Sequence, residues 1–387
     1  MRFSRRVQSL PPYLFAEIER KVAARRAAGV DIISLGIGDP DLPTPPNIVA
    51  ALQRAAADPA NHQYPSNRGT GAFREAVAGF YARRFGVLLD PETEIVPLLG
   101  AKEGIAHIGL ALLDQWDVCL TADPGYPVYT TGPMLADGTA VPLPLKPELG
   151  FQPDLEHIES AALAKAKMLF CGYPNNPTGA VIEDDFFARL TAFGRDHDIV
   201  VVHDNAYADV TYDGYVAPSF LQTPGAKDVG VELFSLSKSY NMTGWRGGAI
   251  VGNRAVVDAF WRLKTNMDSG MFGAVQAACV EALSGPQDSV AEMRRIYQHR
   301  RDTLVAALRG IGLHAEPPKG SIYLWVPVPA GHSSASFAEL VLEQADVIVS
   351  PGAAYGPSGE GYVRLCLTVP DARLEEAVRR IEERVKL

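Results

Sequence analysis

Lys238 lies in a stretch of small and hydroxyl-bearing residues, 235–248, that also contains Ser235, Ser237 and Arg246. Apolar runs precede and follow this stretch, so we expect a turn between two strands. A lysine becomes a nucleophile when burial or a neighbouring cation keeps its amine neutral, and hydroxyls with an arginine suit a phosphate dianion. Lysine chemistry beside a phosphate is what pyridoxal 5'-phosphate requires, because its aldehyde reacts with a lysine amine. The alternative is a surface turn with an ordinary lysine.

A second candidate group follows a run of four apolar residues, 199–202, which continues into His203 and Asp204, with Tyr207 three positions after the aspartate. The run indicates a buried strand, and a carboxylate at the end of such a strand needs a partner. A protonated pyridine nitrogen is suitable, because an adjacent anion keeps the proton on the ring. Tyr207 is close enough in sequence to reach an oxygen of the same ring. An aspartate that caps a helix N-terminus remains the alternative.

Three turns add polar or aromatic groups, each directly after an expected strand. Gly100 is followed by Ala101 and Lys102 at the start of a helix, where backbone N–H groups can hold a phosphate. Tyr126 could stack on a planar cofactor or belong to the core. The amide of Asn176, in a proline-containing turn, could donate to a phenolate oxygen or serve the turn alone. No Gly-x-Gly-x-x-Gly or Walker sequence accompanies these turns, which argues against a nucleotide fold.

These turns require a sheet whose strands end at one edge. Strands and helices alternate after residue 94, which is typical of a mostly parallel sheet with helices on both faces, and ligands bind such sheets beyond the carboxyl ends of the strands. We therefore predict an α/β fold, with a large domain built on a mostly parallel seven-stranded sheet and a smaller α+β domain. The expected strands of the large sheet are 95–99, 118–121, 139–143, 168–171, 199–202, 233–235 and 249–251, and the tail should contain a long helical region at 275–308 and a strand at 347–350. The expected domains are an N-terminal arm with part of the small domain (1–45), the large domain (46–280) and the C-terminal small domain (281–387).

Composition narrows the function classes. The chain has 387 residues, a formal net charge of −9 and 47% hydrophobic residues, which is ordinary for a globular protein with more than one core. The acidic balance argues against nucleic acid as the main partner, and no apolar run suits a membrane span or a signal peptide. Four widely spaced cysteines, and eight histidines without a ligand pattern, predict buried thiols in a reducing cytoplasm and no metal site.

The order of these motifs resembles the fold-type I pyridoxal-phosphate aminotransferases of the aspartate aminotransferase superfamily. The resemblance rests on the Asn-Pro-Thr-Gly sequence at 176–179, the aspartate and tyrosine of 204–207 and the Ser-x-Ser-Lys sequence at 235–238, and it covers nearly the whole chain. It implies transamination between an amino acid, with glutamate as the expected donor, and a 2-oxo acid by a ping-pong mechanism. It also implies a homodimer with shared active sites.

Residue by residue, the resemblance implies roles at the cofactor. Lys238 resembles the Schiff-base lysine that also moves a proton between substrate Cα and cofactor C4'. Asp204 would pair with the pyridinium nitrogen, and Tyr126 would cover the ring. Tyr207 and Asn176 would bond the ring oxygen. The expected catalytic residues are therefore Lys238, Asp204 and Tyr207.

The phosphate and the substrate carboxylate have further expected residues. By the resemblance, phosphate contacts come from Ala101, Lys102, Ser235, Ser237 and Arg246. Tyr64 resembles the tyrosine that reaches the phosphate from the neighbouring subunit. Arg364 matches the arginine that grips the substrate α-carboxylate, a role suited to its bidentate and permanently charged fork, and Gly38 would offer a backbone N–H to the same group. The expected substrate-binding residues are Gly38, Asn176 and Arg364.

Within the superfamily, residues 10–15, 100–107 and 239–246 are most similar to bacterial LL-diaminopimelate aminotransferases. Those enzymes exchange an amino group between glutamate and tetrahydrodipicolinate in lysine biosynthesis, so they recognise a distal carbon that bears both ammonium and carboxylate. Asn67 and Arg68, in the loop after Tyr64, supply no carboxylate. Arg68 would repel a distal ammonium and favour a distal carboxylate unless it points away.

Three other functions remain open. An aspartate- or alanine-type aminotransferase would use the same site for other amino acids. A pyridoxal-dependent C–S β-lyase would use it for elimination, and release of ammonia and pyruvate from cystathionine would reveal that activity. An aminotransferase-like effector domain of a transcription regulator would need a DNA-binding region before the fold, where only 35 residues precede Gly36.

Overall fold

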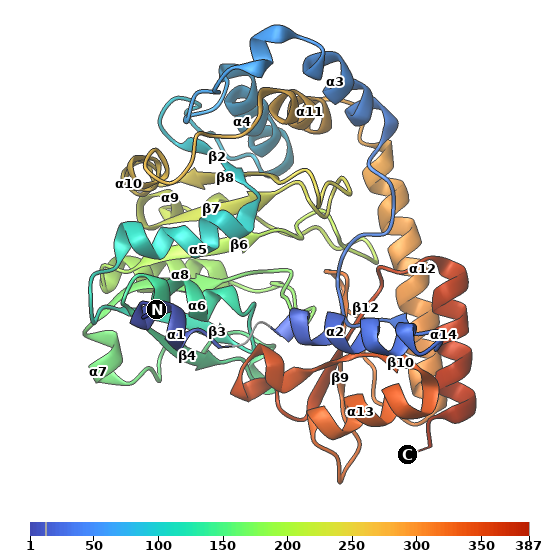
Figure 1. Ribbon diagram of the computed structural model, residues 1–387. Coiled ribbons are helices and arrows are strands. Elements are labelled where there is room, and N and C mark those ends of the chain that lie inside the picture. Colours follow the sequence, from blue (N-terminus) through green and yellow to red (C-terminus); the bar gives the residue numbers. More distant parts are fainter. Residues whose placement is uncertain (12–13, 387) are drawn as a thin grey trace.

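The computed structural model describes residues 1–11 and 14–386, and a seven-stranded sheet forms the centre of its larger part (Figure 1). The strand order is β2-β8-β7-β6-β5-β3-β4. β8 is antiparallel to both neighbours and the other adjacent pairs are parallel, so the predicted mostly parallel sheet is confirmed. The strands are β2 (Ile95–Leu99), β3 (Val118–Asp123), β4 (Thr139–Pro144), β5 (Ala166–Cys171), β6 (Val200–Asn205), β7 (Gly230–Ser235) and β8 (Gly247–Gly252).

Helices cover both faces of this sheet, which explains why its strands are so apolar. Every residue of β3, β7 and β8 is buried, as expected for strands between two helical layers. Successive side chains point to opposite faces, so Leu233 packs in a core cluster with Ile105, whereas Phe234 packs in a second cluster with Phe80. The helices of this part are α3 (Pro46–Ala56), α4 (Gly71–Phe85), α5 (Ala101–Leu112), α6 (Val128–Leu135), α7 (Ser160–Leu163), α8 (Phe186–Asp196), α9 (Ala226–Val229), α10 (Arg254–Lys264) and α11 (Gly273–Ser284).

The smaller part combines an N-terminal segment, which includes α2 and β1, with the C-terminal part of the chain (Figure 1). Its antiparallel three-stranded sheet has the order β11-β12-β9, and β1 pairs in parallel with β10. The strands are β1 (Ile33–Ser34), β9 (Tyr323–Pro327), β10 (Val347–Ile348), β11 (Ser350–Pro351) and β12 (Tyr362–Cys366), and the helices are α2 (Leu14–Ala27), α12 (Asp288–Gly310), α13 (Ser334–Ala345) and α14 (Asp371–Arg384). The pairing of β1 with β10 agrees with an N-terminal segment that belongs to the small domain, while the domain boundaries themselves stay a prediction.

The structure refines two expectations about the tail. The helical region at 275–308 consists of two helices, α11 and α12, because Gly285 and Pro286 interrupt it and proline has no backbone N–H to donate. The single strand expected at 347–350 is divided into β10 and β11, which belong to different sheets. Of the stretch 10–15 that contributed to the resemblance, Pro12 and Tyr13 lie outside the described residues.

Short elements complete the architecture. Helix α1 (Arg5–Ser9) contacts the larger part through an ion pair between Arg6 and Asp137. Single 3₁₀ turns are η1 (Pro59–His62), η2 (Pro147–Leu149), η3 (Phe220–Gln222), η4 (Gly352–Tyr355) and η5 (Pro357–Gly359). All four cysteines are buried with free thiols. Within residues 1–11 and 14–386, no helix has both the length and the apolar content needed to cross a bilayer.

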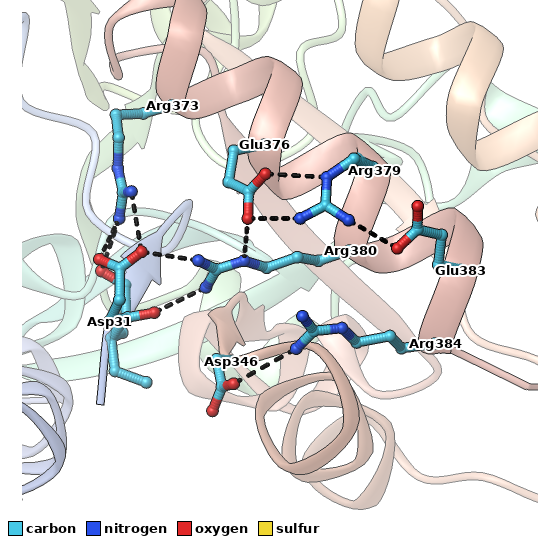
Figure 2. Close-up of polar contacts among 9 residues, drawn as sticks. Asp31, Asp346, Arg373, Glu376, Arg379, Arg380, Glu383 and Arg384 are labelled. Carbon is cyan, nitrogen blue, oxygen red and sulfur yellow. Dashed lines mark hydrogen bonds and ion pairs between the residues drawn. The ribbon is translucent and has the colours of Figure 1, made fainter. Parts of the chain in front are cut away.

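An ion-pair network fastens the N-terminal segment to α14 (Figure 2). Asp31, two residues before β1, lies between Arg373 and Arg380, with N–O distances of 2.7 and 2.6 Å. Arg380 is buried and also donates to the backbone oxygen of Asp31 at 2.6 Å. Hydrogen bonds from the two guanidinium groups lower the pKa of Asp31 to about 2. The charged pair therefore helps to hold β1 in register with β10.

Replacing Asp31 with asparagine should lower the melting temperature at pH 7 by about 1–2 °C, because ion pairs at an exposed carboxylate contribute little individually. The folded-state pKa lies below the ordinary value, so the carboxylate stabilises the fold above about pH 4 and this contribution is lost as the pH falls from about 4 to about 2. The difference from wild type should shrink over the same interval, as thermal unfolding followed by circular dichroism at several pH values would measure.

A matched control is Glu292→Gln, which removes an ion pair with Arg295 inside α12. That pair joins no separate elements, so its loss should change the melting temperature less. A difference between Asp31→Asn and wild type that stays constant from pH 7 to about pH 2.5 would contradict the assigned role of Asp31.

Candidate active site

The predicted polar residues meet at one edge of the large sheet. Strands β2, β3, β5, β6 and β7 run in the same direction, so their carboxyl ends lie together, where ligands bind in open α/β sheets. Asp204 is the penultimate residue of β6, and Lys238 lies three residues after β7. Tyr126 follows β3 and Asn176 follows β5. The topology thus brings together residues that are far apart in sequence: Tyr126 and Lys238 are separated by 238 − 126 = 112 positions.

Lys238 is partly buried, and its amine donates a hydrogen bond to the backbone oxygen of Gly38 at 2.8 Å. Burial lowers the pKa of Lys238 to about 8, and the positive charges of Arg364 and Arg246 act in the same direction against the nearby Asp39. The neutral form of this amine is therefore far more populated near physiological pH than that of an ordinary lysine. A neutral, held amine is the requirement for a lysine nucleophile.

Asp204 has one satisfied and one unsatisfied carboxylate oxygen. Its Oδ2 accepts a hydrogen bond from the hydroxyl of Tyr129 at 2.8 Å, whereas its buried Oδ1 has no hydrogen-bond partner within the described part of the chain. Burial raises the pKa of Asp204 to about 6, although the hydrogen bond from Tyr129 opposes the shift. A buried acceptor without a partner is costly, so this oxygen suits a ligand that presents an N–H group, such as a pyridinium.

A cradle for an anion lies beside Lys238. Ser235 and Ser237 are buried, and the backbone N–H of Ser237 donates to the Ser235 hydroxyl at 3.2 Å. Arg246 lies directly against Gly100, where a Cβ atom would be 2.1 Å from the guanidinium Nη2. Gly100 also has a φ of +79°, which favours glycine. It caps α5, whose first residue is Ala101, followed by the exposed Lys102, and the N-terminal turn of a helix suits an anion.

Arg364, on β12, is completely buried at the meeting point of the two parts of the chain. Its guanidinium donates to Asn176 Oδ1 and to the Gly36 backbone oxygen, both at 2.8 Å. It also lies over the rings of Tyr323 and Tyr355, 3.9 and 4.6 Å from their centroids. Cation–π contacts of this kind hold a guanidinium in one orientation when it is desolvated. The predicted pair Arg364 and Asn176 is therefore in direct contact.

Tyr207 is buried, and its hydroxyl donates to the hydroxyl of Tyr323 at 3.2 Å. The Tyr323 hydroxyl also comes so close to Gly38 that a Cβ atom there would lie 2.2 Å from it. A side chain at position 38 would clash with Tyr323, so this contact requires glycine. The backbone oxygen of the same residue accepts the hydrogen bond from Lys238. Tyr323 therefore contacts three residues of the predicted site, Tyr207, Gly38 and Arg364.

Sequence reasoning missed Tyr129, Tyr323 and Tyr355. Tyr129 lies three positions after Tyr126 in the same turn, and this spacing was a usable signal that a second aromatic residue faces the strand ends. Tyr126 itself is partly buried and meets the ring of Tyr129 edge-on at 5.9 Å. Tyr323 and Tyr355 lie in the tail, where no motif marked them.

Two residues of the loop before α4 lie apart from these groups. Tyr64 is 89% exposed, so within one chain it does not complete the site. Arg68 is held by α10: its guanidinium lies 4.4 Å from the centroid of Trp261 and 3.6 Å from Asp258, and it donates to the Glu92 backbone oxygen. Its charge is thus paired with Asp258 and directed to α10.

The sequence is similar to known aminotransferases. The family model "Aminotransferase class I and II" matches residues 30–381. A protein of Moorella thermoacetica named LL-diaminopimelate aminotransferase is 54% identical over 98% of both chains. The apo structure of BacF from Bacillus subtilis has a TM-score of 0.95 and 40% identity, over 99% of this chain and 98% of that one. A single mutant of Thermus thermophilus aspartate aminotransferase has a TM-score of 0.91 and 31% identity, over 99% of each chain.

These similarities extend over nearly the full length of the chain, and the matched residues 30–381 include Lys238, Asp204 and Arg364. The sheet order and the position of the small antiparallel sheet agree with those of aminotransferase structures. The chain therefore belongs to the class I and II aminotransferase family.

Proposed function

We propose that this protein is a pyridoxal 5'-phosphate-dependent LL-diaminopimelate aminotransferase, which exchanges an amino group between glutamate and tetrahydrodipicolinate. The observation that carries the proposal is the 54% identity, over 98% of both chains, to a protein of that name. A free positive charge on Arg68 would repel a distal ammonium group of the substrate, but Arg68 is paired with Asp258. This arginine is therefore no objection to a substrate with a distal ammonium group.

The residues at the sheet edge fit the cofactor. The buried Asp204 Oδ1 lacks a partner within the described residues, and Gly100 allows the Arg246 guanidinium to lie directly against the start of α5. When bound, pyridoxal phosphate supplies an aldehyde that reacts with amines and a ring that withdraws electrons from the substrate Cα. Asp204 would hold the proton of the ring nitrogen, Tyr207 and Asn176 would bond the ring oxygen, and Tyr126 would cover the ring. The residues proposed for the phosphate are Ala101, Lys102, Ser235, Ser237 and Arg246.

Side chains and backbone groups of the protein would bind the substrate carboxylate and transfer the proton. Arg364, fixed by its two tyrosine rings, would orient the substrate α-carboxylate through a bidentate contact, and the Gly38 backbone would help to hold the same group. Lys238, whose pKa is lowered to about 8, can accept the proton from the substrate Cα and return it, because a base is most effective near its own pKa.

We also propose a homodimer in which Tyr64 reaches the phosphate of the partner's site. Support comes from its position: a tyrosine that is 89% exposed in one chain is free to enter a neighbouring one. The same loop continues to Arg68, which α10 holds in place. A dimer would therefore give each site residues from both chains.

A panel of amino acids tests the reaction. Holoenzyme mixed with LL-diaminopimelate or glutamate, but not with cystathionine, should lose the absorbance band of the bound cofactor, because only a productive amino donor converts it. Stopped-flow spectra with glutamate, aspartate, alanine, LL-diaminopimelate and an aromatic amino acid measure this. No conversion with LL-diaminopimelate would refute the proposed substrate. Release of ammonia and pyruvate from cystathionine would instead favour a lyase.

The rate of cofactor capture by the apo-protein should rise as Lys238 loses its proton. With a pKa lowered to about 8, half of the amine is neutral and reactive at about pH 8, and this fraction approaches its maximum above about pH 9. The rate at which the absorbance of added pyridoxal phosphate shifts, measured from pH 6.5 to 9.5, should therefore be half-maximal at about pH 8 and level off above about pH 9.

Two variants serve as controls for this measurement. Lys238→Ala should abolish the spectral shift, whereas Lys146→Ala, which changes an exposed lysine after β4, should leave its rate unchanged. A rate that keeps rising through pH 9.5, as for a lysine with an ordinary pKa, would contradict the account of Lys238.

A further inference from the structure

A second carboxylate, Glu232 on β7, is completely buried beneath the active-site edge. It accepts hydrogen bonds from five donors, which few carboxylates do. The donors are His203 Nδ1 (2.8 Å), the Tyr81 hydroxyl (2.9 Å), Asn205 Nδ2 (3.0 Å), the Ser219 hydroxyl (2.8 Å) and the Phe220 backbone N–H (2.7 Å). Burial alone would raise the pKa of Glu232, but the bonds from His203, Ser219 and Tyr81 lower it below the ordinary value. Glu232 is thus a fixed negative charge.

This carboxylate lies on the opposite face of the sheet from Asp204. Glu232 is paired with His203 across β6 and β7, and Leu233 with Asp204. Because side chains alternate along a strand, His203 and Glu232 share the face turned away from the predicted cofactor. His203 is completely buried there. His203 nevertheless directly precedes Asp204 in sequence. The contacts of His203 therefore help to fix the end of β6, which carries Asp204.

The contacts of His203 determine its tautomer. Its Nε2 accepts the backbone N–H of Tyr173 at 3.2 Å, so Nε2 carries no proton. The ring proton is therefore on Nδ1, where it is donated to Glu232. A carboxylate that fixes one nitrogen as a donor leaves the other as an acceptor. Glu232 thus prepares His203 to hold the backbone of Tyr173.

Tyr173 begins the turn that carries Asn176. The later part of the turn is held from within, because Asn175 Oδ1 accepts from the backbone N–H of Thr178 at 3.1 Å and from its hydroxyl at 2.7 Å. Its first residue is attached to the sheet through the Tyr173–His203 bond. At its far side, Asn176 contacts Arg364 at 2.8 Å. A line of hydrogen bonds thus runs from Glu232 through His203 and the turn to the arginine expected to bind substrate.

We propose that His203, held in one tautomer by Glu232, is a positioning residue that sets where Asn176 lies against Arg364 and the ring-oxygen position. This inference rests on the proposed function for the roles of Asn176 and Arg364. His203 touches neither substrate nor cofactor. It acts by fixing the start of the turn: the bond to Glu232 sets the tautomer, and the bond from Tyr173 holds the turn.

Two substitutions separate these bonds. In His203→Asn, the amide nitrogen can take the place of Nδ1 and donate to Glu232, but no acceptor reaches Tyr173. In His203→Gln, the longer side chain can place its oxygen near the Nε2 position and accept from Tyr173. The control is Tyr81→Phe, which removes one donor from Glu232 and leaves His203 unchanged.

Two measurements distinguish a positioning role from a purely structural one. Amide hydrogen exchange of residues 173–179 is measured on the cofactor-free protein, and KM for glutamate on the holoenzyme. His203→Asn should raise both by about tenfold, the effect of leaving one buried donor without its acceptor. His203→Gln should lie closer to wild type than to His203→Asn in both. Tyr81→Phe should lower the melting temperature and leave exchange and KM at wild-type values.

Equal effects of His203→Asn and His203→Gln on exchange and KM would overturn the proposal, and so would wild-type exchange in His203→Asn. If Tyr81→Phe raised both quantities as much as His203→Asn, the role would be general stability and the proposal would be wrong. Failure of the proposed function is recognised separately, because wild-type holoenzyme would then show no transamination while the exchange of residues 173–179 could still be compared.

Discussion

The removal of the Lys238 amine from water is the constraint on which the rest of the site depends. Its hydrogen-bond acceptor, the Gly38 oxygen, belongs to a segment 200 residues earlier in the chain. That segment is fastened at both ends by arginines: those of α14 bind Asp31, and the buried Arg300 binds both oxygens of Asp41 at 2.7 and 3.0 Å. Ion pairs distant from the chemistry therefore help to fix the segment that supplies the acceptor of the Lys238 amine.

The two buried carboxylates of β6 and β7 illustrate how this fold separates support from chemistry. Glu232 is surrounded by five donors and has no capacity left for a ligand. Asp204, one strand away on the other face, retains a buried oxygen without a partner in the described residues. Since an unpaired buried acceptor destabilises a fold, its persistence at the carboxyl edge of the sheet indicates the position of a ligand. The adjacent strands thus carry one carboxylate for stability and one for binding.

Much of this arrangement could be predicted from the sequence, for identifiable reasons. Buried parallel strands appear as continuous apolar runs, and the residues directly after them, such as Lys238, must lie at one edge. Arg364 was found only because the order of motifs resembled a known family. Tyr129, Tyr323 and the Glu232 network were not predicted, because they depend on which side chains meet across strands and between the two parts of the chain. Register and long-range packing leave no local spacing by which to find such contacts.

The central claim is that Lys238 is the amine that bonds the cofactor. The most direct test is reduction of the holoenzyme with borohydride, which makes the bond between cofactor and lysine permanent, followed by peptide mapping with mass spectrometry. We predict one added pyridoxyl group per chain, on the peptide that contains Lys238 and at that residue. Modification of a different lysine, or a fully loaded protein with no modified peptide, would contradict the account.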